Sequence, residues 1–540
     1  MTDAAVHAGV RQIEAVLFLL LLFVIAFGAL ARRLQIAYPI ILVIAGLFVS
    51  FVPELPRVSL NPDIVFLAIL PPLLFHAAWL TSWREFHYNL ASILMLAFGL
   101  VGFTVFGVAL ASGTIFTLLT WQTGIVLGAI VAPTDAIAAT SIARRVGLPE
   151  RVTHVLEGES LVNDATGLLA LEFGITLVVS GHSPAWDVGL WRMFWLTIGG
   201  IGIGVSVGWL VRQFELLIDD GPIEMTLILI TPYASYFAAE EAHASGVLAV
   251  VACGLYLGRH SSEFFSPGVR LQASALWTAL DFTLNGLVFI LIGLQLPFVL
   301  AGLHEYSFGL LLLYAGGFST FVIILRLVWV YPGAYAAYWI RIHILKQHEA
   351  LPSTKALFVV GWTGMRGVVS LAAALSLPEV MANGHPFASR NLIIFLTFSV
   401  ILVTLVLQGL SLPPLIRALG LVRKNEADFE EDEARRLMIE AGIAHIQDMQ
   451  TKHVSKEPDV ARMFDELLSH HQERLATLLY RHEQNSWSES FSHYSRLSHE
   501  LLRIERRTAL NLRSEGRIND VVLRRLEREL DLSETRIDAA

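Results

Sequence analysis

The residues best suited to chemistry form a short polar string inside an apolar stretch: Glu159, Ser160, Asn163 and Asp164. On a helix, Glu159 and Asn163 share one face, and Ser160 and Asp164 share the adjoining face. The string offers two carboxylates, a hydroxyl and an amide, without any Cys or His. Such oxygen ligands suit hard cations, so the pattern predicts a site for a monovalent cation or a proton. A buried polar network that only fixes helix packing is the alternative.

A second polar group lies one apolar run earlier, where Thr134 and Asp135 follow Pro133. Proline removes a backbone donor and clashes with the preceding turn, so it breaks or kinks a helix. At membrane depth, a broken helix is tolerated only where it is buried or lines a cavity. We therefore expect Thr134 and Asp135 to lie at the same site as the first string. A proline kink with Asp135 capping the next helix is the alternative.

Two arginines, Arg326 and Arg366, are single charges within apolar stretches. An unpaired charge at such a position is costly, so each is expected to face a carboxylate unless it extends to the membrane surface. The candidate partners are Glu159, Asp135, Asp281, Glu240 and Glu241. The glycines that surround Arg366 predict a second irregular helix there.

The composition is that of a membrane protein. Of 540 residues, 55% are hydrophobic and 16% charged, against about 45–50% and about 25% in soluble domains. This excludes an ordinary soluble enzyme and a disordered chain, and the single Cys253 excludes a disulfide framework. Residues 418–540 hold 19 of the 38 basic and 24 of the 47 acidic residues. We therefore predict a membrane domain over 1–417 and a water-soluble helical tail over 418–540.

A bilayer-spanning helix needs about 20 mostly apolar residues, and thirteen such runs are present. They are 13–31, 36–53, 63–80, 90–118, 122–143, 153–180, 189–213, 223–241, 244–259, 275–299, 307–341, 355–378 and 391–417. The two interrupted runs, 122–143 and 355–378, lie at corresponding places in two halves of the chain. Broken helices so placed are typical of the midplane site of a secondary transporter. The fold class predicted is an all-α polytopic membrane protein with an α-helical tail.

Basic residues predict the orientation. Twelve Lys and Arg residues lie in the loops on the side of the tail and four on the other side, and basic loops remain in the cytoplasm. We expect a multi-pass protein of the cell (inner) membrane, with the N-terminus outside and the tail in the cytoplasm. No motif for ATP binding or covalent chemistry is present, so we expect no enzymatic activity, no cofactor and no nucleic-acid partner.

The chain resembles the monovalent cation/proton antiporters, in the sodium/proton exchanger branch. The similarity lies in PPLLFHAAW at 71–79, PTDAIA at 133–138, GESLVNDATG at 158–167, GVLAVVACG at 246–254, LNGLVFILIGLQLP at 284–297 and GMRGVVSLA at 364–372. It covers nearly all of the membrane domain, and the tail contributes nothing to it. One departure is the Thr-Asp-Ala at 134–136, where many relatives have Thr-Asp-Pro.

The resemblance implies a thirteen-span inverted-repeat fold with two broken, crossing helices, a homodimer, and elevator-like movement of one domain. It implies that Asp164 binds either Na⁺ or a proton and that Asn163, Ser160, Thr134 and Asp135 surround it. It also implies that Glu159 pairs with Arg326, and that Arg366 sits where the broken helices cross.

Exchange follows if one carboxylate is neutralised by either a proton or a cation, and only the neutral forms cross. A second carboxylate at position 163 would carry a second proton, so Asn163 predicts one-for-one, electroneutral exchange of Na⁺ or Li⁺ for H⁺. K⁺/H⁺ exchange at the same site stays open, as do a cation channel and a non-transporting membrane sensor. The tail is expected to be a solvated helical bundle with an unidentified partner. Its seven histidines match no metal-site spacing, and a pH-sensing role for them stays open.

Three further features have more than one interpretation. His76 is either a proton relay or a buried histidine. Asp281 and Asn285, one turn apart on a helix, either line a cavity or hold Arg326. Gly200, Gly204 and Gly208 form a stripe of small residues that predicts close helix packing, including a possible dimer face.

Overall fold

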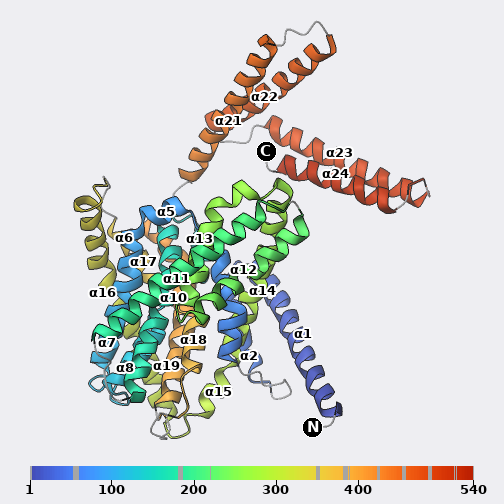
Figure 1. Ribbon diagram of the computed structural model, residues 1–540. Coiled ribbons are helices and arrows are strands. Elements are labelled where there is room, and N and C mark those ends of the chain that lie inside the picture. The colour runs from blue at the N-terminus through green and yellow to red at the C-terminus, as the bar shows by residue number, and fades with distance from the viewer. Residues whose placement is uncertain are drawn as a thin grey trace. The chain divides into compact units, whose positions relative to one another are not determined.

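The computed structural model of the protein describes residues 3–52, 60–180, 186–218, 220–347, 353–380, 387, 389–421, 426–452, 458–484, 489–515, 517–518 and 520–538. All the elements named in these ranges are helices. Figure 1 shows them as a bundle of long helices followed by two helical hairpins. The chain divides into two compact units, Met1–Lys424 and Asn425–Ala540.

The first half of the membrane unit contains the following helices. They are α1 (Asp3–Leu34), α2 (Tyr38–Val49), α3 (Pro62–Ile64), the π-helix η1 (Val65–Ile69), α4 (Leu70–Leu80), α5 (Trp83–Tyr88), α6 (Leu90–Leu94), the π-helix η2 (Met95–Leu100), α7 (Val101–Ala111), α8 (Trp121–Val131), α9 (Ala136–Val146), α10 (Glu150–Ser180) and α11 (Trp186–Glu215). Each of the first seven apolar runs coincides with one of these helices or with consecutive ones.

The second half continues in the same way. Its helices are α12 (Gly221–Glu241), α13 (Gly246–Phe264), α14 (Pro267–Leu294), α15 (Leu296–Ala301), α16 (Phe308–His343), α17 (Thr354–Trp362), α18 (Val368–Leu375), α19 (Arg390–Val403), the π-helix η3 (Thr404–Gln408) and α20 (Gly409–Leu419). Within the described residues, eight helices are long and apolar enough to cross a bilayer. The thirteen crossings stay a prediction.

Both interrupted runs are broken helices, as their proline and glycines predict. In the first, α8 ends at Val131 and α9 begins at Ala136, with the Asp135 side chain capping α9 by accepting the amide of Ile137 at 2.8 Å. In the second, α17 ends at Trp362 and α18 begins at Val368. Each break leaves backbone carbonyls and amides without helical partners inside the bundle.

The membrane unit contains two groups of packed helices. The scaffold group comprises α1, α2, α4 and α11–α14, and the site group comprises α6–α10 and α16–α20. The centre of the site group is α19, which is buried continuously from Leu392 to Ile401. Figure 1 shows α18 and α19 inside the bundle and α1 at its edge. The broken helices therefore lie in a tightly packed interior.

The stripe of small residues on α11 packs against α13 of the same chain. A Cβ at Gly204 would lie 2.8 Å from the Ala249 Cα, and one at Gly200 would lie 2.7 Å from the Ser245 carbonyl oxygen. The close helix packing predicted from the sequence is confirmed. The possible dimer face at this stripe is wrong, because α13 already covers it.

The second unit consists of α21 (Glu426–Lys452), α22 (Pro458–Gln484), α23 (Glu489–Ser514) and α24 (Asp520–Asp538). The helices pack in pairs, α21 with α22 and α23 with α24. In the second pair, Arg506 donates hydrogen bonds to Asp531 at 2.5 Å and to Glu534 at 2.8 Å. Of the tail histidines, His453 lies outside the described residues.

Candidate functional site

The two broken helices cross at backbone level. The amide of Asp135 donates a hydrogen bond to the Met365 carbonyl at 2.8 Å. The Asp135 side chain lies so close to Gly367 that a Cβ there would be 2.7 Å from the Cβ of Asp135. Only a residue without a side chain fits here, and this explains the last glycine of the GMRG string. The crossing brings Asp135 against the start of α18.

Arg366 supports the crossing through backbone carbonyls. Its side chain donates from Nη1 to the carbonyls of Ala132 at 2.5 Å and Pro133 at 3.0 Å. These carbonyls follow the C-terminal end of α8, where the helix dipole is negative. Its amide donates to the Thr404 hydroxyl at 3.1 Å. Among the described residues no carboxylate forms a salt bridge with Arg366, contrary to the expectation from the sequence.

Arg326 and Glu159 form a buried ion pair. Nη1 of Arg326 contacts Oε1 of Glu159, and Nη2 donates to Oε2 at 2.9 Å. The Arg326 side chain also donates to the Val360 carbonyl near the end of α17, from Nη2 at 3.1 Å and from Nε at 3.3 Å. The exposed fractions are 1% for Arg326 and 0% for Glu159. The pair therefore ties α10 to α16 and to the second broken helix.

Thr134 and Asn163 extend this network. The Thr134 hydroxyl donates to Oε1 of Glu159 at 2.9 Å, and Nδ2 of Asn163 donates to the Thr134 hydroxyl at 2.8 Å. Glu159 thus receives hydrogen bonds on both of its oxygens. These contacts fix the Glu159 carboxylate between Arg326 and Thr134.

Asp164 lies in a different environment on the same helix. Its exposed fraction is 7%, and the structure records no hydrogen bond or ion pair to its carboxylate from the described residues. Its charge interacts with that of Asp135 on the broken helix. A buried carboxylate without a partner is costly.

Other side chains that carry oxygen atoms lie close to Asp164 in the sequence or belong to the broken helix that contains Asp135. Oδ1 of Asn163 is buried and has no hydrogen-bond partner among the described residues. Ser160 lies one helical turn before Asp164 on α10, at intermediate exposure. Together with Thr134 and Asp135, these residues supply carboxylate, amide and hydroxyl oxygens.

Three other placements differ from, or add to, the predictions from the sequence. Asp281 pairs with His76 at 3.6 Å instead of holding Arg326, and His76 stacks on Trp277 with 5.3 Å between the ring centres. Nδ2 of Asn285 is buried without a partner in the described part of the chain. Sequence reasoning missed Thr404, which accepts the Arg366 amide and begins the π-helix η3, because no sequence motif marks it.

These features define a class of protein. An all-helical membrane chain with two broken helices crossing beside buried carboxylates has the architecture of a secondary transporter. The family model described as "Sodium/hydrogen exchanger, transmembrane" matches residues 18–418. The chain therefore belongs to the sodium/hydrogen exchanger family. It is a multi-pass membrane antiporter and not an enzyme.

Individual relatives agree with this assignment. The chain is 32% identical over 529 residues to an uncharacterised Na⁺/H⁺ exchanger of Mycobacterium tuberculosis, covering 94% of this chain and 93% of the relative. It is also 32% identical over 442 residues to a sodium, potassium, lithium and rubidium/H⁺ antiporter of Bacillus pumilus, covering 80% of this chain and 65% of the relative.

A solved structure has the same fold. The sodium proton antiporter MjNhaP1 of Methanocaldococcus jannaschii matches with a TM-score of 0.56 at 20% identity, covering 77% of this chain and 99% of that chain. The all-helical antiporter fold expected from the sequence is thereby confirmed.

Proposed function

We propose that this chain exchanges Na⁺ or Li⁺ for H⁺, with Asp164 binding either ion. The observation that carries the proposal is the contrast between two carboxylates five residues apart on α10. Glu159 is saturated by Arg326 and Thr134, whereas Asp164 is buried without a recorded partner among the described residues. The first can fix the structure, while the second can change its ligand.

The cation would be held by oxygen atoms from both broken-helix regions. Asp164 supplies the charge that a proton or a cation neutralises, and Asp135, Asn163, Ser160 and Thr134 supply further oxygens. Small hard cations suit such a set. Asp164 would not bind a proton and a cation at the same time, because one carboxylate is neutralised by one proton or by one cation.

Alternating access then follows from the free-energy cost of a bare charge. Moving an ionised, unpaired carboxylate through the bilayer interior is costly, so the empty site would cross slowly. Either loaded form removes that charge and would cross readily. Since position 163 is an amide, we propose electroneutral one-for-one exchange, with the gradient of one ion driving the other.

The membrane placement and assembly also belong to this proposal. Twelve basic residues against four favour a cytoplasmic tail and an external N-terminus, in the inner membrane of a cell. The resemblance to the antiporters supports a homodimer and elevator-like movement. The tail would serve as a cytoplasmic regulatory or interaction module.

The test is a proton-gradient assay in proteoliposomes. The dye signal is recorded after addition of Na⁺, Li⁺ or K⁺, with wild type beside Asp164→Asn. The matched control is Glu172→Gln, since Glu172 lies on the same helix but pairs with Arg192 at an exposed position. We expect Na⁺ and Li⁺ to collapse the gradient in wild type and control but not in Asp164→Asn. Equal activity of all three proteins would refute the role of Asp164.

A second candidate is K⁺/H⁺ exchange through the same residues. The observation in its favour is the similarity to the Bacillus pumilus antiporter, whose name includes potassium and rubidium. A gradient collapsed by K⁺ but not by Na⁺ would select it, and the loss in Asp164→Asn would be the same.

A further inference from the structure

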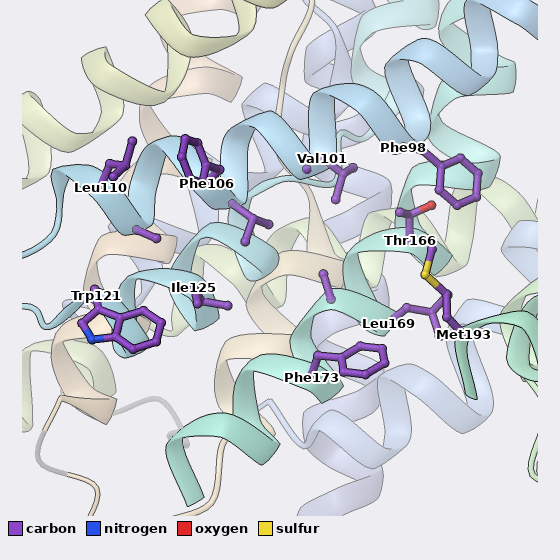
Figure 2. Close-up of a pocket in the computed structure, with 14 residues that line it drawn as sticks. Phe98, Val101, Phe106, Leu110, Trp121, Ile125, Thr166, Leu169, Phe173 and Met193 are labelled. Atoms are coloured by element: carbon purple, nitrogen blue, oxygen red, sulfur yellow. The ribbon is translucent and has the colours of Figure 1, made fainter. Parts of the chain in front are cut away.

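An apolar groove lies on the site group, at the point where it meets Met193 of α11. Its volume is about 740 Å³, and its walls come from η2, α7, α8, α10 and α11. Figure 2 shows Phe106 and Leu110 on one wall, Trp121 and Ile125 on a second, and Leu169 and Phe173 on a third. Met193 contributes from α11, the only scaffold-group helix among the lining residues.

We propose that this groove binds one acyl chain of a membrane phospholipid. The first argument is chemical. The one hydroxyl among the lining residues is that of Thr166, and it is already satisfied because it donates to the Val162 carbonyl at 3.0 Å. A water molecule needs two or more polar partners to occupy a cavity, and besides Thr166 the described lining offers only the indole N–H of Trp121 at the exposed rim. An apolar occupant is required.

The second argument is location. The rim residues Phe106, Leu110 and Trp121 are 63%, 61% and 54% exposed, so the groove is open to its surroundings. In a transmembrane protein the surroundings of an exposed apolar helix face are lipid chains. The bilayer therefore delivers the occupant at very high local concentration.

The third argument is depth. Trp121 begins α8, and Figure 2 shows it at the same end of the groove as Leu110. Tryptophan collects at the membrane–water interface, which places this end of the groove at the edge of the bilayer. Along η2 and α7 the lining runs from Phe98 to Leu110, a helical length of about 18 Å. This matches one leaflet of a hydrocarbon core about 30 Å thick, so one chain from one leaflet fills it.

The position of the groove gives the bound chain a role. Thr166 and Leu169 lie on α10 just after Asp164, and Met193 lies on the opposing scaffold helix. An acyl chain there would lie between the helix that carries the ion site and the helix group that stays behind when the site moves. This consequence rests on the proposed exchange function. Exchange rates should then depend on acyl-chain length and unsaturation.

Gly102 allows a direct test of binding. It lines the groove, and a Cβ built on it meets no atom within 4 Å. The substitution Gly102→Leu therefore places a branched apolar side chain in the groove, with open space around its Cβ. Gly202 on α11 is also exposed and open within 4 Å but does not line the groove, so Gly202→Leu is the matched control. Gly102→Ala adds too little volume to fill the space and serves as a second control.

The protein is reconstituted with a phospholipid that carries a diazirine on one acyl chain, irradiated without any ion gradient, and digested for mass spectrometry. We expect labelling concentrated on 98–110, 121–125 and 166–173, competed by unlabelled phospholipid. The label should be lost in Gly102→Leu and retained in Gly102→Ala and Gly202→Leu. Even labelling of all lipid-facing helices, or unchanged labelling in Gly102→Leu, would overturn the proposal.

The exchange assay separates the two proposals. Wild-type exchange should vary with the acyl-chain length of the vesicle, whereas exchange by Gly102→Leu should not. Because labelling is measured without transport, its outcome does not depend on whether Asp164 carries Na⁺. Specific labelling with no Na⁺/H⁺ exchange would retain the lipid site and reject the proposed function.

Discussion

Replacing Glu159 by Gln is expected to lower stability, whereas replacing Asp164 by Asn is expected to stop exchange without lowering stability. Glu159→Gln leaves the Arg326 guanidinium buried without a counter-charge. Breaking one side of a buried ion pair costs about 3–5 kcal/mol. Asp164→Asn removes a buried charge that has no recorded partner among the described residues, so no stabilising contact is lost.

This loss of unfolding free energy can be converted to a decrease in melting temperature. Unfolding entropy is about 2.1 cal/mol/K per residue, and the membrane unit ends at Lys424. The resulting entropy of roughly 0.9 kcal/mol/K turns a loss of about 3–5 kcal/mol into a decrease of about 3–6 °C. The assay is intrinsic-fluorescence melting of each purified variant in one detergent, with exchange measured on the same preparations.

The double variant Glu159→Gln with Arg326→Met supplies the control. It removes both charges, so it should melt closer to wild type than Glu159→Gln alone. The reasoning is refuted if Glu159→Gln has the melting temperature of wild type, or if the melting temperature of Asp164→Asn decreases by the same amount as that of Glu159→Gln. Either result would mean that the two carboxylates do not differ as their contacts indicate.

Three further predictions concern the crossing, the stoichiometry and the tail. Gly367→Ala should reduce stability by at least about 1 kcal/mol, as overpacking does, because the new methyl group meets Asp135; fluorescence melting checks it. Asn163→Asp should make exchange electrogenic if the variant folds, and currents on a solid-supported membrane would detect it. In the tail, the hydrogen bond from Arg506 lowers the pKa of Glu534. That pair should stabilise the hairpin near neutral pH and lose this contribution as the pH falls through the lowered pKa, measured by hydrogen exchange of the full chain.

A control variant or a contrary outcome tests each of these predictions. Gly316→Ala places its methyl group in open space on α16 and should melt as wild type does. Electroneutral exchange by a folded Asn163→Asp protein would contradict the prediction that the residue at position 163 sets the stoichiometry. Glu534→Gln should make the hairpin's hydrogen exchange less dependent on acidic pH, while the exposed Glu515→Gln should not. Identical pH profiles for the two tail variants would reject the Glu534 assignment.

The sequence allowed the helix breaks and the polar string to be predicted because their causes are local. Pro133 cannot continue a helix hydrogen-bond ladder, and the four polar residues on α10 follow helical spacing. The eight apolar helices are similarly visible as runs of suitable length. These features require no knowledge of what lies across the bundle.

The partners of the arginines could not be assigned in the same way. Arg326 and Glu159 are 167 positions apart, so their pairing depends on how α16 packs against α10. Arg366 was expected to face a carboxylate. It donates instead to two backbone carbonyls that the first helix break leaves free at the negative end of α8. A search of the sequence for acidic residues misses such acceptors, because these backbone carbonyls are free only where the helix is broken.

The same broken helices also explain how two acidic residues on one helix can differ in function. The crossing frees the carbonyls that bind Arg366, so Arg366 does not compete with Arg326 for Glu159. Glu159 is then wholly committed to Arg326 and Thr134, and the next acidic residue on α10, Asp164, is left buried without a recorded partner in the described region. Fixing the first carboxylate makes the second available. If exchange requires Asp164 to be without a permanent partner, introducing a permanently charged basic side chain beside it should abolish exchange. Strengthening the ion pair between Glu159 and Arg326 should not.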